Sequence, residues 1–323
     1  MTASSKQAPL VTIIGGSGFV GRYVAQALAK RGWRVRVACR RPNEALFVKP
    51  YGAVGQVEPV QCNIRNQASV AQVIAGSDAV VNCVGVLFES GQNTFEDVQA
   101  EGAGCVARVA AEAGVARLAH LSAIGADRQS PAQYARTKAD GEQAVLDAFT
   151  DAVILRPSII FGTEDQFFNR FAAMTRMSPI LPLIGAETKF QPVWVQDVAE
   201  AAARAVDGKV APGTYELGGP NVYTFRELMT LMLDVVKRQR PLVNIPFFAA
   251  RLKASVLQML PNPPLTVDQV RLLEHDNVVH DDAKGFAEIG IVPVAPEAVI
   301  ESYLYAYRPY GQYTALTEGG DTG

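Results

Sequence analysis

The sequence contains few of the residues that bind metals or form disulfides. Its 323 residues include only three histidines and four cysteines. The cysteines form no C-x-x-C pair, and the histidines are not spaced as metal ligands. We therefore expect no metal site, and we expect the cysteines to be small buried hydrophobic residues in a reducing compartment.

An excess of charge of one sign is also absent. The 30 Lys and Arg residues balance 32 Asp and Glu residues, for a formal net charge of -2, which disfavours nucleic-acid binding. No apolar run reaches the roughly 20 residues of a membrane-spanning helix. The segment Met1–Lys6 lacks the apolar core of a signal peptide. We expect a chain with no signal peptide and no transmembrane helix that starts in the cytoplasm.

Hydrophobic residues and glycines are plentiful, at 49% and 27 residues, and permit a large core. Short apolar runs alternate with helical patterns from residue 10 to about residue 155, which is typical of a parallel sheet with crossover helices. The expected strands are Leu10–Ile14, Arg34–Cys39, Val57–Gln61, Asp78–Cys83, Arg117–Ser122, Ala152–Leu155 and Gly213–Leu217. The sequence thus predicts an α/β fold, a Rossmann-type doubly wound parallel sheet with a smaller, mostly helical C-terminal lobe.

The predicted organisation has four parts. An N-terminal tail covers residues 1–9, a nucleotide-binding domain 10–165, the smaller lobe 166–312 with a sheet contribution near 190–217, and a flexible tail 313–323. Two capping boxes predict helix starts in the smaller lobe. They are Thr224-x-x-Glu227 and Thr266-x-x-Gln269.

A glycine-rich turn follows the first strand. Gly15 lets the chain reverse, Gly18 permits close approach of a pyrophosphate, and Gly21 lets the next helix pack on the strand. The helix N-terminus would face the phosphates with its N–H groups. The predicted contacts from this turn also include Ser17, Phe19 and Val20. The alternative is a turn that only reverses the chain.

Basic residues occupy the position that distinguishes NAD from NADP. An acidic residue after the second strand usually holds the adenosine ribose, but here the strand runs into Arg40 and Arg41, which favours the 2′-phosphate of NADP(H). The alternative is that both arginines decorate a solvent-facing loop. Asn63 and Ile64 are expected to flank the adenine, and Val84–Gly85 to pass under the cofactor.

A phenol and an ammonium group lie on one predicted helix face. Tyr134 and Lys138 are four residues apart, where the cation could favour the phenolate. Ser122 ends the preceding strand and could hydrogen-bond a substrate carbonyl beside that phenol. These three residues are the predicted catalytic set.

The glycine spacing, this set and the Leu155–Pro157 segment together resemble the short-chain dehydrogenase/reductase superfamily, in its extended and atypical branches. The resemblance implies that the serine, tyrosine and lysine form an acid/base site for hydride transfer. It also implies that Tyr134, Lys138 and Pro157 contact the cofactor. It names no substrate.

A finer resemblance comes from His120–Asp127, Leu155–Gly162, Pro264–Leu273, Asp276–Val279 and Tyr307–Gln312. These segments are similar to the NADPH-binding accessory subunits of respiratory complex I, the NADH:quinone oxidoreductase. The resemblance implies tightly bound NADP(H), no independent turnover and other complex I subunits as partners. It implies a peripheral position on the cytoplasmic side of the inner membrane, near the junction of the two arms.

Two other functions remain open from the residues. The complete catalytic set fits a free-standing NADP(H)-dependent reductase or epimerase that acts on a small carbonyl or sugar-nucleotide substrate. A redox-sensing regulator fits the nucleotide-binding domain equally well.

The segment 247–260 predicts an amphipathic helix with Phe248, Leu252, Val256 and Met259 on one stripe. Such a stripe could contact lipid headgroups or another subunit. The alternative is that it packs on the core of its own lobe.

Overall fold

The computed structural model describes residues 8–260, 263–309 and 311. The predicted tail 313–323, most of the predicted tail 1–9, and Gln312 of the last motif lie outside this part. The chain divides into two compact units. The first contains the chain up to Arg156 together with Gln196–Glu216 and Lys284–Ile291, and the second contains the remainder. The units are discontinuous in sequence because later segments return to the first sheet.

A seven-stranded sheet organises the first unit, in the order β11-β6-β5-β4-β1-β2-β3. Its strands are β1 (Leu10–Ile14), β2 (Arg34–Cys39), β3 (Val57–Gln61), β4 (Ala79–Asn82), β5 (Arg117–Leu121), β6 (Val153–Pro157) and β11 (Gly213–Leu217). The ladders from β3 through β6 are parallel. The predicted Rossmann-type fold is confirmed, and the strand order reverses between β1 and β4, where such folds bind ligands.

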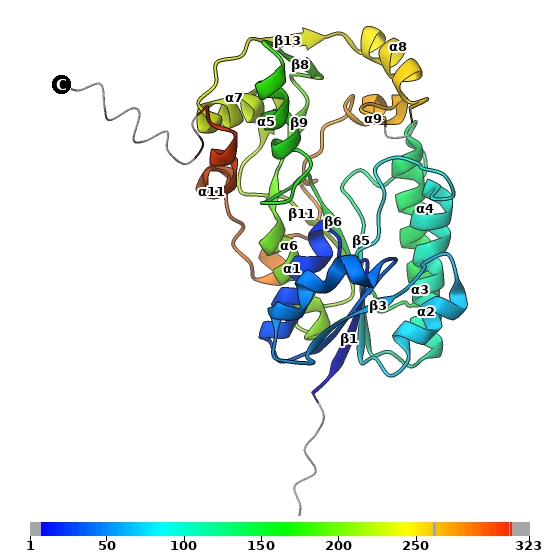
Figure 1. Ribbon diagram of the computed structural model, residues 1–323. Coiled ribbons are helices and arrows are strands. Elements are labelled where there is room, and N and C mark those ends of the chain that lie inside the picture. Colours follow the sequence, from blue (N-terminus) through cyan, green and yellow to red (C-terminus); the bar gives the residue numbers. More distant parts are fainter. Residues whose placement is uncertain (1–7, 261–262, 310, 312–323) are drawn as a thin grey trace, which may run out of the picture. The chain divides into compact units, whose positions relative to one another are not determined.

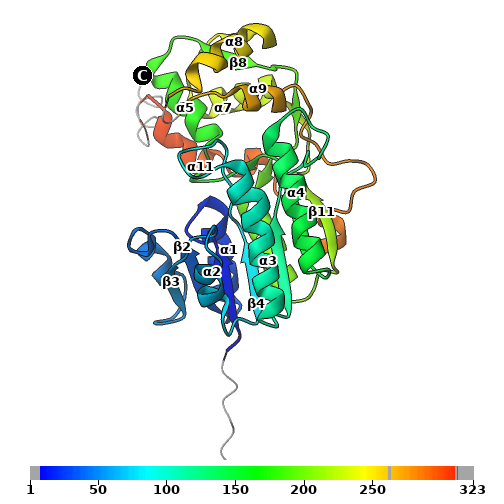
Figure 2. The same ribbon diagram turned by 90° about the vertical axis from the view of Figure 1, so that its right-hand side faces the viewer.

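Helices cover both faces of this sheet (Figure 1). They are α1 (Phe19–Lys30), α2 (Gln67–Ile74), α3 (Glu101–Glu112), α4 (Gln133–Ala148), α6 (Val195–Val206) and the short α10 (Phe286–Ile289). The helices α2, α3 and α4 lie on one face, with α1 and α6 on the other, and α3 and α4 lie side by side (Figures 1 and 2). Apolar residues from alternate strand positions, such as Val80 and Leu118, pack with Val106 of α3 and Val145 of α4 in a fully buried core.

Two short irregular helices complete the first unit. They are η1 (Pro42–Tyr51), which is 3-10, and η2 (Glu96–Ala100), which is a π-helix directly before α3. The apolar spacing from Thr94 to Gly114 is typical of a single helix. The observed helix ends where predicted, with Gly114 at φ +69°, but its first turn is widened to π.

The second unit is built from short elements around an aromatic core. Its strands are β7 (Ile160–Phe161), β8 (Leu181–Ile184), β9 (Lys189–Phe190), β10 (Val193–Trp194), β12 (Tyr223–Thr224) and β13 (Leu242–Ile245), paired as β7 with β10, β9 with β12 and β8 with β13. Its helices are α5 (Phe168–Met177), α7 (Phe225–Val236), α8 (Phe247–Leu257), α9 (Val267–Leu272), η3 (Pro296–Ala298), α11 (Glu301–Leu304) and η4 (Tyr305–Tyr307). Helices contribute more residues to this unit than strands do, as predicted for a mostly helical lobe.

Side chains rather than long strands connect the segments of this unit. Phe167 contacts four other phenylalanine rings, with centroids 5.0 to 6.3 Å away. The Asn277 side chain accepts hydrogen bonds from Ser158 Oγ and from the Ile159 backbone N–H, at 2.7 and 3.1 Å. Both predicted capping boxes are confirmed, at the starts of α7 and α9. No helix in the described part of the chain is both long and apolar enough to cross a bilayer.

Candidate functional site

The turn between β1 and α1 has the close packing that the glycine pattern predicted. Gly15 has φ +79°, and its N–H donates to the Ala38 carbonyl at 2.8 Å. A Cβ on Gly21 would lie 2.4 Å from the Gly15 carbonyl oxygen, so no larger residue fits without movement of the backbone. The first turn of α1 contains no acidic residue, and its N-cap Gly18 provides no side-chain cap. The first N–H groups of the helix are thus available to an anionic ligand.

The other predicted residues of this turn are Ser17, Phe19 and Val20. Phe19 and Val20 are the first two residues of α1. The Ser17 side chain hydrogen-bonds the Cys39 thiol at the end of β2. This contact joins the turn to the strand that leads into Arg40.

The segment after β4 lies against the same turn. The Val84 backbone N–H donates to Asn82 Oδ1 at 3.1 Å, which fixes the direction in which the chain leaves the sheet. Val84 Cγ2 lies 2.9 Å from the position that a Cβ on Gly15 would take. A Cβ on Gly85 would lie 3.3 Å from Lys138 Nζ. Segments from both sides of the strand-order reversal therefore meet at this point.

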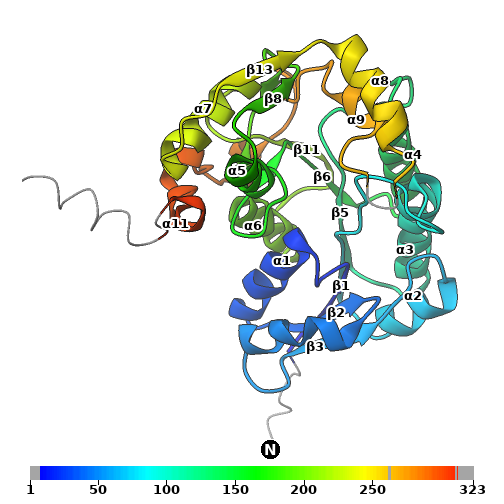
Figure 3. The same ribbon diagram turned by 45° about the horizontal axis from the view of Figure 1, so that its top comes forward.

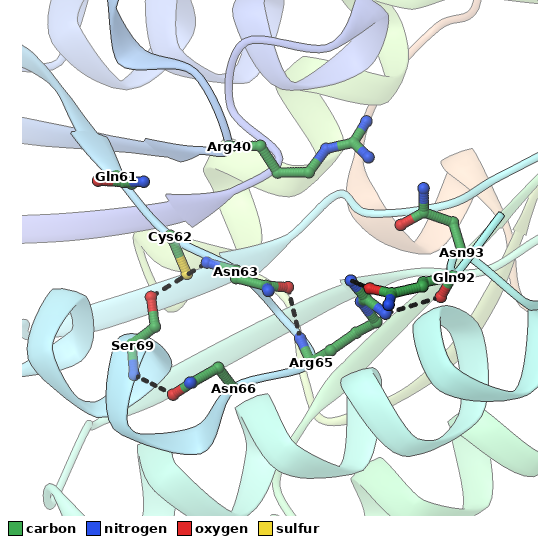
Figure 4. Close-up of a pocket in the computed structure, with 9 residues that line it drawn as sticks. All are labelled: Arg40, Gln61, Cys62, Asn63, Arg65, Asn66, Ser69, Gln92 and Asn93. Carbon is green, nitrogen blue, oxygen red and sulfur yellow. Dashed lines mark hydrogen bonds between the residues drawn. The ribbon is translucent and has the colours of Figure 1, made fainter. Parts of the chain in front are cut away.

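An open pocket of about 520 Å3 lies beside the ends of β2 and β3 (Figure 4). This volume is within the range of roughly 300–1,000 Å3 that small-molecule sites occupy. Arg40 and Asn63 line it, as the sequence predicted for the adenosine end of the cofactor. The described residues that line the pocket include two guanidinium groups, Arg40 and Arg65, and no Asp or Glu.

Two predicted residues do not line this pocket. The Arg41 side chain is exposed and pairs with Glu44 at 3.1 Å. Ile64 is buried in the core beneath the sheet end, where its side chain would contact a Cβ on Gly102. Three residues that the sequence did not single out, Arg65, Gln92 and Asn93, line the pocket instead.

The predicted catalytic residues come from β5 and α4. Ser122 follows β5 and is buried, and none of the described residues hydrogen-bonds its hydroxyl. The Lys138 ammonium is also buried, donates to the Leu121 carbonyl at 3.2 Å and lies 6.0 Å from the centroid of the Tyr134 ring. The Tyr134 ring packs edge-on against Phe95, with centroids 5.8 Å apart. The last predicted contact, Pro157, ends β6 next to β5 in the sheet.

Burial controls the protonation of this set. Desolvation lowers the pKa of Lys138 to about 8, although the nearby Glu142 carboxylate acts in the opposite direction. Desolvation raises the pKa of Tyr134 to about 12. The expected lowering of the tyrosine pKa by the lysine is therefore wrong for this structure. At neutral pH the phenol is protonated and can donate a proton.

These residues fit a dinucleotide on two structural grounds. The glycine turn leaves a space that side chains would fill, and the buried Ser122 hydroxyl is left for a ligand to satisfy. The glycine turn would hold the pyrophosphate, Arg40 the adenosine end, and Lys138 the nicotinamide ribose. A bound nicotinamide would supply hydride chemistry, with Ser122 orienting a carbonyl oxygen and Tyr134 donating a proton to it.

Comparisons with known proteins agree with this geometry. The model of the NAD dependent epimerase/dehydratase family matches residues 11–218. The chain is 36% identical to Arabidopsis thaliana "NADH dehydrogenase [ubiquinone] 1 alpha subcomplex subunit 9, mitochondrial", over 95% of this chain and 80% of that protein. It is 30% identical to a Caulobacter vibrioides protein named ceramide reductase, over 73% of this chain and 74% of the relative.

The fold is also similar to a solved structure, an Escherichia coli NADPH-dependent quinone oxidoreductase complexed with NADPH. That match has a TM-score of 0.70 and 20% identity, and covers 91% of this chain and 99% of the other. The chain therefore belongs to the NAD dependent epimerase/dehydratase family, and its relatives include proteins named as subunit 9 of the NADH dehydrogenase alpha subcomplex.

Proposed function

We propose that the chain is an accessory subunit of the membrane-associated NADH:ubiquinone oxidoreductase, complex I, that binds NADP(H) without independent turnover. The observation that carries this proposal is the 36% identity, over 95% of the chain, to a protein named as a subunit of that enzyme. Its partners would be other complex I subunits. It would lie peripherally on the cytoplasmic side of the inner membrane, near the junction of the two arms, as the resemblance to complex I accessory subunits implies.

Pocket chemistry supports NADP(H) over NAD(H). A carboxylate after β2 would accept hydrogen bonds from the ribose hydroxyls of NAD(H) but would repel a 2′-phosphate. Here the described lining has no carboxylate, and Arg40 presents a planar set of donors that suits a phosphate. A bound 2′-phosphate would partly neutralise the Arg40 charge.

Co-purification with cofactor analysis tests this proposal. Membranes are solubilised gently, the NADH dehydrogenase is isolated, and its bound nucleotides are extracted and identified. We expect this chain to travel with the enzyme and to carry NADP(H) that does not exchange with added nucleotide. A chain that stays in the soluble fraction, free of the enzyme, would contradict the assembly role.

A second candidate function is a free-standing NADP(H)-dependent reductase or epimerase acting on a small carbonyl or sugar-nucleotide substrate. The intact catalytic set favours it, because the buried Ser122 hydroxyl and the protonated Tyr134 phenol are the groups that such a reaction requires. Tyr134→Phe distinguishes the two functions. Loss of turnover with retained cofactor indicates an enzyme, whereas unchanged complex I assembly and cofactor content indicate a stabilising subunit.

A membrane surface is the partner that the outer face of α8 fits best. Phe248, Leu252 and Val256 are 76%, 72% and 66% exposed, whereas the helix buries Ala250 and Ala254. The helix packs on α9 through this small-residue face, and the two lie side by side (Figures 1 and 3). The predicted apolar stripe therefore does not form the core of its own lobe.

The basic residues near α8 support an anionic surface as this partner. The sequence from residue 235 to 267 contains no Asp or Glu, and its only charged residues are Lys237, Arg238, Arg240, Arg251 and Lys253. Apolar residues on one face with basic residues nearby are typical of helices that lie at a lipid headgroup boundary. We include contact with an anionic lipid surface through 247–260 in the proposed function.

A further inference from the structure

The loop between β4 and η2 forms one wall of the pocket beside Arg40. Within this loop, Ser90 and Asn93 exchange two backbone hydrogen bonds, at 3.2 and 3.0 Å, and Gly91 between them has φ +56°. The result is a closed turn. It places Gln92 and Asn93 at the pocket, 27 residues along the chain from Arg65 on the opposite wall.

Arg65 connects the two walls. Its Nη1 donates to the Gln92 carbonyl at 2.8 Å, and its Nη2 donates to Gln92 Oε1 at 3.2 Å (Figure 4). Two donors on one planar guanidinium fix the orientation of the partner as well as its distance. Of the two arginines at the pocket, Arg65 is therefore the one engaged with the opposite wall.

The wall that carries Arg65 is itself well ordered by hydrogen bonds. Asn63 Oδ1 accepts from the Arg65 backbone N–H at 3.2 Å, and the Asn63 N–H donates to Ser69 Oγ at 3.0 Å. Ser69 lies in the first turn of α2, whose N-cap Asn66 accepts from the Ser69 N–H. Arg65 thus extends from a turn that is anchored to β3 and α2, toward a loop that leaves the sheet after β4.

We infer that Arg65 is a positioning residue that clasps the 88–94 loop across the adenosine pocket and slows release of the cofactor. This inference rests on the proposed binding of NADP(H). A clasp retains the adenosine whether or not it carries a 2′-phosphate. A direct phosphate contact by Arg65 would instead favour NADPH over NADH.

Release kinetics of the two reduced cofactors distinguish these roles. The full chain is loaded with NADPH or with NADH, and nicotinamide fluorescence is followed after mixing with a large excess of oxidised cofactor. Arg65→Met removes the donors but keeps the apolar stem. We expect it to accelerate release of both cofactors about 3- to 10-fold, since two exposed hydrogen bonds from a charged donor are lost.

Two further variants serve as matched controls. Arg40→Met is expected to accelerate NADPH release by a larger factor than NADH release, because only NADPH carries the 2′-phosphate. Gln92→Ala removes one of the two acceptors and is expected to give a smaller increase than Arg65→Met, with no further increase when it is combined with Arg65→Met. Thermal unfolding of each variant shows whether the fold is retained.

Four outcomes would overturn the inference. Unchanged release of both cofactors from Arg65→Met excludes a clasp. Accelerated release of NADPH alone assigns Arg65 to the phosphate. Additive effects of the Arg65 and Gln92 substitutions show that the two residues act separately. A wild-type chain that binds neither cofactor overturns the proposed function itself, and the inference with it.

Discussion

His120 lies on β5 two residues before Ser122 and is almost fully buried. Its Nδ1 is 3.1 Å from Asn82 Nδ2, and Asn82 Oδ1 already accepts from the Val84 N–H. This pattern assigns Asn82 as the donor and places the imidazole proton on Nε2, for which no described residue is an acceptor. Burial lowers the pKa of His120 to about 3, so the ring is neutral at physiological pH.

This buried histidine makes stability depend on pH. Between about pH 6.5 and pH 3 the unfolded chain binds a proton at residue 120 that the folded chain does not, so stability falls as pH falls through this window. We expect the free energy of unfolding to drop between pH 7 and pH 5 by about 2 kcal/mol more in the wild type than in His120→Gln. Urea unfolding at the two pH values measures this difference. Equal drops in the two proteins would show that His120 titrates normally in the fold.

Arg156 joins three elements of the first unit: β6, on which it lies, α4 and β11. It makes two hydrogen bonds to the Glu142 carboxylate, at 2.9 and 2.6 Å, and lies 3.5 Å from Glu216. Both glutamates are about 95% buried, and Glu142 is one turn from Lys138 on the same helix. The arginine therefore offsets two buried negative charges and fixes the helix that carries Tyr134 and Lys138.

Loss of this arginine would leave the glutamates without compensation. We expect Arg156→Met to lower the free energy of unfolding by about 3 to 5 kcal/mol at neutral pH, because buried charges without a partner are costly. Adding Glu142→Gln to this variant should recover part of the loss, since the nearer of the two charges is then removed. Denaturant unfolding of the single and double variants tests this expectation. A double variant less stable than Arg156→Met would contradict the charge argument.

At the scale of the elements, some features could be predicted from the sequence and others could not. The seven strands of the large sheet and both capping boxes were predictable, because each depends on residues that are neighbours in sequence, whereas the short strands of the second unit were not predicted. The π-turn of Glu96–Ala100 was missed because apolar spacing does not report one extra residue in a turn. The widened turn packs closely against α4, since a Cβ on Gly141 would lie 2.1 Å from the Gln99 carbonyl oxygen.

Only some of the residues that line the pocket could be predicted from the sequence. Arg40 was predictable because it follows β2 directly, at a position with a known role in this fold. Arg65 was not, since its partner Gln92 lies 27 residues away in a loop without a pattern. Ile64 was predicted beside the adenine, but its side chain turns into the core. Residues next to a strand end lie near it, but their side chains need not point the same way.

At the scale of the whole molecule, a row of exposed apolar side chains runs along α8 and the residues after it. Phe248, Leu252 and Val256 lie on one side of α8, and Met259 and Leu260 follow the helix with 84% and 51% exposure. Single exposed apolar residues are common on soluble proteins, but a row of them marks a surface that contacts something else. The segment 235–267 contains no Asp or Glu, and this is the basis for the proposed contact with an anionic surface. Of its basic residues, Arg251 pairs with Glu274.

A change of one valine on this surface should release the chain from anionic membranes. We expect Val256→Glu to lower the fraction bound to anionic phospholipid vesicles about ten-fold, because it removes an apolar contact and adds a repelled charge. Val292→Glu is the matched control, since Val292 is 89% exposed and lies outside the α8 segment. Sedimentation with vesicles measures both variants beside the wild type, and purely zwitterionic vesicles should bind all three weakly. Equal losses from the two substitutions, or wild-type binding that ignores lipid charge, would exclude α8 as the membrane contact and leave its apolar face to a protein partner.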